Sequence, residues 1–311
     1  MEIITVTGNL LAEWTFSVDA ATTGDTHRAR GMDFQVGGKG INVSRVLRRL
    51  GEETEAIAFA DGPLADQCSK WLHYNRITHR FFPFGDAGVR PGFVIREKTP
   101  KHPETTFLGQ DLTVPDASWK AGFQYLRERR PGWLALCGSI PGWRPQWAAE
   151  VRDLLQLEKP VRLCVDTYGP PLRDLAQFPL DAVKINRSEL DRLIDGPETA
   201  STPEAIARAR SGSPVRTWII TDGPRPVIAG LADGTTYAIT PAQIQEQSPT
   251  GSGDTFLAAL LHRWRREAGK PAEAALAFAT ACATANAASP GIGDFPMPVP
   301  ERFYPQIERV A

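Results

Sequence analysis

Cysteine, charge of one sign and long apolar runs are all scarce in this sequence, and each scarcity excludes a class of protein. Its 311 residues include four cysteines, which lie far apart and form no C-x-x-C pair. We therefore expect neither a disulfide framework nor a zinc site. Cys137 and Cys164 each end an apolar run and are interpreted as small buried side chains in a reducing cytoplasm.

The charges nearly cancel, because 35 Lys and Arg stand against 36 Asp and Glu and give a formal net charge of -1. This balance argues against a general attraction to nucleic acid or to a membrane surface. Any bound anion must therefore be held by cations placed locally. No run approaches roughly eighteen apolar residues, so we expect no membrane span. The N-terminal MEIITVTGN lacks the basic and apolar regions of a signal peptide, so we expect a cytoplasmic protein.

Apolar runs and helical patterns alternate along most of the chain. Apolar residues at i, i+3, i+4 and i+7 predict helices over 43–50 and 257–264. We expect one domain over residues 1–311, an α/β sandwich with three layers (α/β/α) around a mostly parallel sheet. The runs that suit buried parallel strands are Ile3–Val6, Ala56–Ala60, Trp133–Cys137, Val161–Val165, Ala182–Ile185 and Val215–Ile220.

Two segments, at about 9–36 and 89–110, break this alternation. They contain β-branched and aromatic stretches such as Trp14–Val18 and Pro91–Ile95. Both segments are predicted to form short, half-exposed antiparallel strands and not crossover helices. We expect a small sheet built from these insertions to cover one end of the main domain as a lid.

A glycine-containing loop runs into an amphipathic helix at Ser248–Phe256 and gives the strongest functional signal. Gly251 and Gly253, with Ser252 between them, allow a tight turn whose N–H groups point outward. The free N–H groups and the dipole of the helix start favour an anion there. Asp254 follows in the first helical turn, beside the predicted position of a phosphate.

The carboxyl group of Asp254 distinguishes between uses of this loop. A dinucleotide-binding turn requires G-x-G-x-x-G, but the third position is Phe256, and an acid so close would repel a pyrophosphate. A base that accepts the proton of a sugar hydroxyl suits the position, since the loop N–H groups would stabilise a transferring phosphoryl group. On this segment alone, helix capping explains Asp254 equally well.

A second glycine-rich turn opens a helix at residues 36–43. It matches neither a Walker A motif nor a dinucleotide fingerprint. The double glycine that ends at Gly38 lets a small ligand approach the main chain, and Lys39 and Asn42 lie one helical turn apart on one side. The turn is a candidate ligand site, although alone it is a weak signal.

Two further turns follow predicted strands. Asn186 ends an apolar strand and Glu189 lies three residues on, a spacing that fits either a helix cap or a polar pair holding magnesium-bound water beside nucleotide phosphates. Thr221 and Gly223 follow the next strand and form either a simple turn or a loop that contacts phosphates. The residues alone leave both choices open.

In this order and spacing, these pieces resemble the ribokinase/PfkB family of carbohydrate kinases, from Thr5 to about Gly293. The block GGKGINV at 37–43 is similar to the family's N-terminal signature, and TGSGDT at 250–255 is similar to its C-terminal G-A-G-D signature. The resemblance implies a ribokinase-like fold whose β-sheet lid often forms a homodimer interface. It also implies ATP and Mg²⁺ as cofactors and a small-molecule sugar or sugar phosphate as partner.

The same resemblance implies roles for single residues. Asp254 corresponds to the catalytic base, and Gly251, Ser252 and Gly253 correspond to the anion hole. Glu189 corresponds to a magnesium contact through water. The implied nucleotide-binding residues are Asn186, Thr221, Gly223, Gly251, Gly253 and Asn286.

Within the family, residues 37–51 and 137–142 look most like the branch of 1-phosphofructokinases and tagatose-6-phosphate kinases, whose acceptor already carries a phosphate. The resemblance places Arg28, Lys39 and Arg90 where that branch holds the substrate phosphate. Arginine suits such a contact because its planar fork makes bidentate, charge-assisted bonds. Further implied substrate contacts are Gly38, Asn42 and Ser139.

The chain departs from this branch at the substrate end. The usual N-P-A-x-D, whose Asp contacts sugar hydroxyls, is replaced by NLLAE at 9–13, so Glu13 stands where the Asp is usual. Its longer reach would select a different sugar or pose. We predict an ATP-dependent kinase for a phosphorylated ketohexose. The alternatives are a kinase for an unphosphorylated sugar or nucleoside, and a catalytically silent sugar-phosphate-binding protein.

Overall fold

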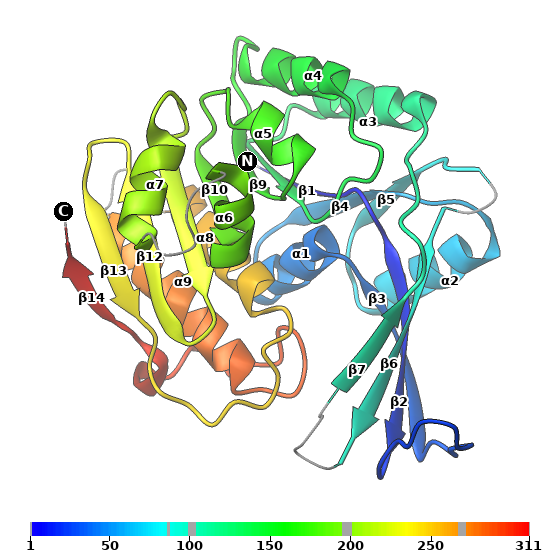
Figure 1. Cartoon of the computed structure of the whole chain (residues 1–311). Coiled ribbons are helices and arrows are strands. Elements are labelled where there is room, and N and C mark those ends of the chain that lie inside the picture. The colour runs from blue at the N-terminus through cyan, green and yellow to red at the C-terminus, as the bar shows by residue number, and fades with distance from the viewer. Residues whose placement is uncertain (1, 86–87, 99–103, 195–200, 267–271, 311) are drawn as a thin grey trace.

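The computed structural model describes residues 2–85, 88–98, 104–194, 201–266 and 272–310, which fold around one large sheet (Figure 1). In this part of the chain the sheet has the strand order β14-β13-β12-β11-β10-β9-β8-β1-β4-β5. In that order the strands are Gln306–Arg309, Thr236–Thr240, Arg225–Leu231, Thr217–Asp222, Ala182–Asn186, Arg162–Asp166, Trp133–Cys137, Ile3–Thr7, Thr54–Phe59 and His79–Phe82.

Within the part of the sheet from β11 to β5, every pair of adjacent strands is parallel. All six predicted strands belong to this parallel part, with ends shifted by no more than two residues, so the predicted mostly parallel sheet is confirmed. The sheet continues through β12, β13 and β14, which pair antiparallel. The sequence did not predict this edge, because short and partly polar strands such as Gln306–Arg309 carry little apolar periodicity.

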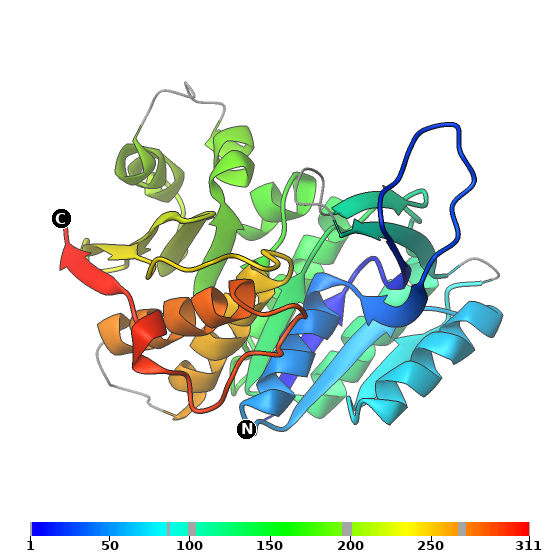
Figure 2. The same ribbon diagram turned by 90° about the horizontal axis from the view of Figure 1, so that it is seen from below.

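Helices cover both faces of the sheet and give the three predicted layers. On one face, apolar residues of α1, α8 and α9 share a core cluster, and Figure 2 shows α8 and α9 (orange) beside α1 (blue). On the other face, α3 to α7 pack in a second cluster. The helices are Lys39–Arg49 (α1), Gly62–Tyr74 (α2), Asp116–Arg129 (α3), Pro145–Leu155 (α4), Pro170–Leu175 (α5), Arg187–Ile194 (α6), Thr202–Arg210 (α7), Ser252–Arg266 (α8) and Ala272–Ala287 (α9), with a 3₁₀ turn at Glu301–Phe303.

The two insertions form a separate four-stranded sheet, the lid, in the order β3-β2-β6-β7. Each insertion is an antiparallel pair, as predicted. The sequence made no prediction of how the two insertions pair with each other: β2 and β6 pair in parallel, because both leave the main domain in the same direction. Residues 99–103 of the second insertion lie outside the described residues. The lid strands are Leu11–Val18 (β2), Gly31–Gly37 (β3), Arg90–Glu97 (β6) and Glu104–Leu108 (β7).

The two faces of the lid differ in chemistry. One face is aromatic: the Trp14 ring lies 5.1 Å from that of Phe34 and 5.5 Å from that of Phe93, centroid to centroid. The base of this face packs on α2 in a third core cluster. Alternation along a strand puts Glu13 and Gln35, which are paired across β2 and β3, on the opposite face. The lid therefore presents a polar face as well as an apolar one.

Two features of the composition can now be located. All four cysteines are buried and free, as interpreted for Cys137 and Cys164. Over the described ranges, none of the helices has the length and apolar character required to cross a membrane.

Glu52, a buried acid just after α1, forms ion pairs with residues near the end of α8. Glu52, whose side chain is fully buried, accepts from His262 Nδ1 at 2.7 Å and from Arg266 Nε at 2.5 Å, and also pairs with Arg265. Burial raises the pKa of Glu52, but the charges of these partners outweigh burial and lower it below the usual value. The contact connects residues more than two hundred positions apart.

We predict that Glu52→Ala lowers the free energy of unfolding by about 2–3 kcal/mol. Breaking a buried ion pair costs about 3–5 kcal/mol, and the half-exposed Arg266 reduces that figure. The matched control is Asp153→Ala, because Asp153 and its partner Arg152 are both about half exposed and should contribute less than about 0.5 kcal/mol. Thermal and urea unfolding midpoints measure both. Equal shifts in the two variants would contradict the assignment.

Candidate active site

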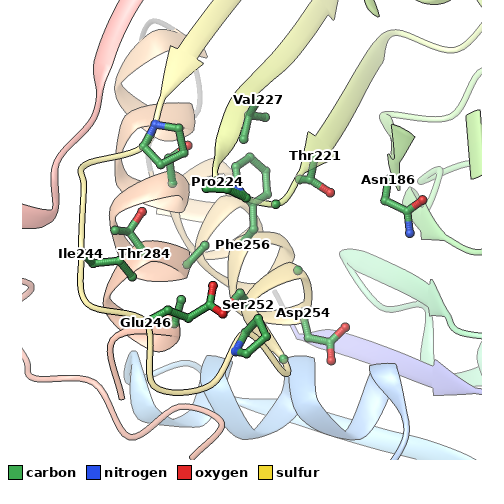
Figure 3. Close-up of a pocket in the computed structure, with 18 of the residues that line it drawn as sticks. Asn186, Thr221, Pro224, Val227, Ile244, Glu246, Ser252, Asp254, Phe256 and Thr284 are labelled. Atoms are coloured by element: carbon green, nitrogen blue, oxygen red, sulfur yellow. The ribbon is translucent and has the colours of Figure 1, made fainter. Parts of the chain in front are cut away.

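A cavity of about 680 Å³ lies at the carboxyl end of the parallel strands. It is bounded by the ends of β10 and β11, the segment 241–251, the start of α8 and the side of α9. Figure 3 shows Asn186, Thr221 and Asp254 on one side of it and Ile244 and Thr284 on the other. The residues singled out in the sequence that line it are Lys39, Asn186, Glu189, Thr221, Gly223, Gly251, Ser252, Gly253 and Asp254.

The start of α8 forms one wall and is built as the glycines predicted. Gly251 has φ +76°, and a Cβ there would lie 2.6 Å from Ile292, so the turn requires glycine. At Gly253 a Cβ would lie 2.6 Å from Lys184 Nζ, which brings an ammonium group directly under the turn. The first N–H groups of α8 have no partner within the helix, and this end of the helix lines the cavity.

Asp254 is buried in the first turn of this helix, and its side chain is 7% exposed. Its Oδ2 accepts a hydrogen bond from Asn42 Nδ2 at 2.7 Å, which joins the two glycine-rich turns of the sequence. Burial and the nearby Asp166 carboxylate raise the pKa of Asp254 to about 6, against the lowering effect of Lys184, Asn42 and Lys39. Such a carboxyl group is ionised near neutral pH and is still basic enough to accept a proton.

A carboxylate that was not predicted from the sequence, Asp166, lies at the centre of the site. Asp166, fully buried at the end of β9, accepts from Lys39 Nζ at 2.6 Å and from Lys184 Nζ at 2.7 Å. Burial alone would raise the pKa of Asp166, but the two lysines outweigh it and hold the pKa below the usual value. The pKa of Lys39 is raised in return, because Asp166 and Glu189 outweigh its burial.

Asn186 and Glu189 form the cap that their spacing allowed. Asn186 N–H donates to Glu189 Oε2 at 2.9 Å, and Glu189 N–H donates to Asn186 Oδ1 at 2.9 Å. Both residues also line the cavity, and Glu189 Oε1 lies 3.6 Å from Lys39 Nζ. The cap thus fixes a carboxylate at the cavity wall, so the structural and functional interpretations are compatible.

Magnesium fits this wall as a partly hydrated ion. Within the described ranges, no group of three or more His, Cys, Asp and Glu side chains could hold a metal ion. Mg²⁺ usually keeps several waters and takes one or two carboxylates together with phosphate oxygens. Glu189 is the carboxylate that would hold such an ion through water.

The far end of the cavity is more apolar. Val227, Ile244 and Phe256 line it with the methyl-bearing Thr284. A cavity with an apolar end and a helix N-terminus at the other suits a nucleotide, with its base at the first and its phosphates at the second.

A second group of predicted residues lies beside the cavity, at the base of the lid. A Cβ at Gly38 would lie 2.6 Å from Thr7 and 3.6 Å from the Asn9 carbonyl, so the start of α1 abuts the end of β1. Asn9 Nδ2 donates to Ser139 Oγ at 3.1 Å and to Asp111 Oδ1 at 2.8 Å. Arg90 Nη1 donates to the same Asp111 oxygen at 2.8 Å. We refer to Asn9, Arg90, Asp111 and Ser139 as the acceptor end.

Glu13 and Arg28 lie on the lid. Glu13 accepts a hydrogen bond from Gln35 on the polar face. Arg28 is exposed in the segment between β2 and β3, and the structure does not bring it to the cavity or into the acceptor end. Its implied contact with a substrate phosphate therefore stays a prediction.

Asn286 does not line the cavity either. It is 1% exposed, and its amide nitrogen donates to the Thr250 carbonyl at 3.0 Å and to Ser252 Oγ at 3.1 Å. Its oxygen accepts from Thr255 Oγ1 and from the Gly293 N–H. We interpret Asn286 as a support of the 250–252 turn, because its hydrogen-bonding groups are already occupied.

Signals for the missed residues were present in the sequence. Asp166 directly follows an apolar run, and Lys184 interrupts another, AVKIN, which becomes β10. A charged residue within or at the end of a buried parallel strand indicates a paired charge. Asp111 follows a predicted lid strand without any such contrast, so only its contacts reveal it.

Comparison with known proteins agrees with this geometry. The family model for pfkB family carbohydrate kinases matches residues 1–300. Among solved structures, a Thermotoga maritima protein described as a possible 1-phosphofructokinase is 19% identical, with a TM-score of 0.84 over 100% of both chains. Escherichia coli phosphofructokinase-2 in complex with fructose-6-phosphate is 19% identical, with a TM-score of 0.82 over 92% of this chain and 93% of that one. A carbohydrate kinase from Agrobacterium tumefaciens is 18% identical, with a TM-score of 0.75 over 100% of both.

Because the family match spans residues 1–300 of 311, this chain belongs to the PfkB family of carbohydrate kinases. It is a sugar kinase, that is, a phosphotransferase with an alcohol group as acceptor, and membership of the family implies that it uses ATP. The structural matches show the ribokinase-like fold.

We predict that kcat/KM falls about tenfold for each pH unit below pH 6 and is level above it. Asp254 accepts a proton only as the carboxylate, and its raised pKa of about 6 places the loss of that form in this range. ADP release measured from pH 4.5 to 9 tests this, with circular dichroism to check that the fold persists in acid. A flat profile between pH 5 and 7 would exclude titration of Asp254 as the limiting step.

Proposed function

We propose that this protein transfers the γ-phosphate of ATP to a hydroxyl group of a phosphorylated ketohexose, with Asp254 as general base. The observation that carries the proposal is the position of Asp254. Asp254 is buried, accepts a hydrogen bond from Asn42, and has a raised pKa. It lies in the first turn of α8, the helix whose start lines the cavity.

In the proposed reaction, the acceptor hydroxyl gives its proton to Asp254 while its oxygen attacks the γ-phosphorus of ATP. The bond from the γ-phosphorus to the bridging oxygen breaks, and ADP leaves. The N–H groups of Gly251 and Gly253 and the ammonium groups of Lys39 and Lys184 would face the charge that the transferring phosphoryl group carries, whereas the Ser252 N–H donates to the Pro249 carbonyl at 3.2 Å. Glu189 would hold Mg²⁺ through water, and the ion would neutralise charge on the phosphates.

Two observations support a phosphorylated acceptor. Arg90 is an arginine at the acceptor end with its side chain 16% exposed, so it is largely fixed before a ligand arrives. Its remaining N–H groups suit the oxygens of a phosphate. Lys39 lies between the acceptor end and the cavity, since its Cβ is 3.7 Å from a Cβ position at Gly138, next to Ser139.

A second acceptor class is favoured by the acids of the same region. Asp111 already pairs with Arg90, and Glu13 adds a second carboxylate on the lid. Carboxylates accept hydrogen bonds from sugar hydroxyls, so an unphosphorylated sugar or nucleoside is the second candidate.

A homodimer through the lid stays part of the proposal. Exposed apolar side chains gather on the lid strands, where Met32 is 62%, Phe93 is 42% and Phe107 is 60% exposed. Apolar groups in this number on one small sheet suit contact with a second protein surface.

We predict that Asp254→Asn lowers turnover by about 10²–10⁴ and leaves the fold intact, because Asn cannot accept the proton but keeps the shape. Magnesium-dependent ADP release measures this against fructose 1-phosphate, fructose 6-phosphate, tagatose 6-phosphate, fructose, ribose and adenosine. Turnover within tenfold of the wild type would remove Asp254 as base. Turnover with neutral acceptors alone would keep the base and replace the phosphorylated acceptor.

We also predict that Arg90→Ala raises KM for a phosphorylated acceptor about tenfold or more and leaves KM for ATP within twofold, because one charge-assisted contact contributes about 1.5–3 kcal/mol. Steady-state kinetics with each substrate varied in turn measure both constants. The matched control is Arg96→Ala, which removes another lid arginine paired with an acid, Glu104. An unchanged KM for the acceptor would remove Arg90 from phosphate binding.

A further inference from the structure

At the acceptor end, Arg90 already pairs with the carboxylate of Asp111, which an incoming anion would have to displace. Asp111 Oδ1 accepts from Arg90 Nη1 at 2.8 Å and from Asn9 Nδ2 at 2.8 Å. Asn9 in turn donates to Ser139 Oγ, so one oxygen atom of Asp111 links the lid strand β6 to the ends of β1 and β8.

The exposed fractions of the two side chains indicate that Arg90 is held by its surroundings and that the Asp111 side chain can move away from it. The Arg90 side chain is 16% exposed, whereas that of Asp111 is 55% exposed. Arg90 Nε is buried and has no hydrogen-bond partner, so its guanidinium group is not fully satisfied by Asp111. Because the unpaired Nε is itself buried, an arriving anion would bind Arg90 at the edge that now donates to Asp111, an acid that water can reach.

The backbone holds Asp111 in this position. Asp111 lies two residues after Gly109, whose N–H donates to the Pro91 carbonyl at 2.8 Å, and a Cβ at Gly109 would lie 2.9 Å from Pro91. Arg90 itself donates through its N–H to the Leu10 carbonyl at 3.0 Å. The main chain at Arg90 and just before Asp111 is therefore anchored at the lid base, whereas the Asp111 side chain is exposed, and an acceptor that reaches Arg90 meets the Asp111 charge as well.

We infer that Asp111 is a specificity-determining residue of the acceptor end, which lowers the preference of the enzyme for phosphorylated over neutral sugars. The inference rests on the proposed function, in which Arg90 faces the acceptor. A phosphate must replace Asp111 on Arg90 and approach its negative charge, whereas a neutral hydroxyl does neither. Asp111 therefore raises KM for phosphorylated acceptors relative to KM for neutral ones, whose hydroxyls can donate to its carboxylate.

The test compares Asp111→Asn with the wild type on fructose 6-phosphate and fructose. Asn keeps an oxygen that accepts from Asn9 and Arg90 but removes the charge. We expect the ratio of KM for fructose 6-phosphate to KM for fructose to fall about fivefold (about 1 kcal/mol), since half-exposed charges are partly screened. The change should shrink in added salt.

Asp116→Asn is the matched control. Asp116 lies five residues further on and pairs with Arg144 at 2.7 Å, outside the acceptor end, so its loss should leave the ratio unchanged. Asp111→Ala separates charge from position. A merely structural Asp111 predicts that Asn is neutral and that Ala raises both KM values in proportion, and this result would overturn the inference.

The same variants distinguish failure of this inference from failure of the proposed function. If the wild type turns over no acceptor, the proposed function fails, and calorimetric binding of the two sugars without ATP replaces KM. The inference is supported in either case if the affinity for fructose 6-phosphate relative to that for fructose is higher in Asp111→Asn than in the wild type. An unchanged ratio, or no binding by either protein, overturns it.

Discussion

The site depends on the buried ion triad of Asp166, Lys39 and Lys184. A carboxylate at zero exposure is costly unless charged partners surround it, and both of its oxygens are taken by ammonium groups. The triad joins the ends of β9 and β10 to the start of α1. It also places one ammonium under the Gly253 turn and the other beside Glu189, so the core and the catalytic end share a single set of contacts.

The same triad determines the chemistry of Asp254. Asp166 adds negative charge near a second buried carboxyl group and helps to raise its pKa, while the lysines limit the rise. Asp166 thus stays ionised and Asp254 becomes the more basic of the two. Separation of two acids by their surroundings is a general way to obtain a base that works near neutral pH.

The lid adds a second set of polar groups beside this arrangement of charges at the sheet edge. Its aromatic face packs on α2, and its polar face brings Glu13 and Gln35 together. Its base carries Arg90 with Asp111. The cavity is therefore built on the main sheet, whereas Glu13, Arg90 and Asp111 lie on or shortly after strands of the lid.

The sequence by itself determined the parallel strands, the two glycine-rich turns and the family, because apolar periodicity and turn chemistry are local properties. It also indicated Asn186 and Glu189 as either a capping pair or a polar pair at a magnesium site. Only the tertiary structure decided the parallel pairing of β2 with β6, the use of Asn286 as a support, and the charges of the site. Lys39 and Asp166 are 127 positions apart, and no local pattern links them. The fold causes their pairing, because it brings the strand ends together and because a buried charge is stable only beside an opposite charge.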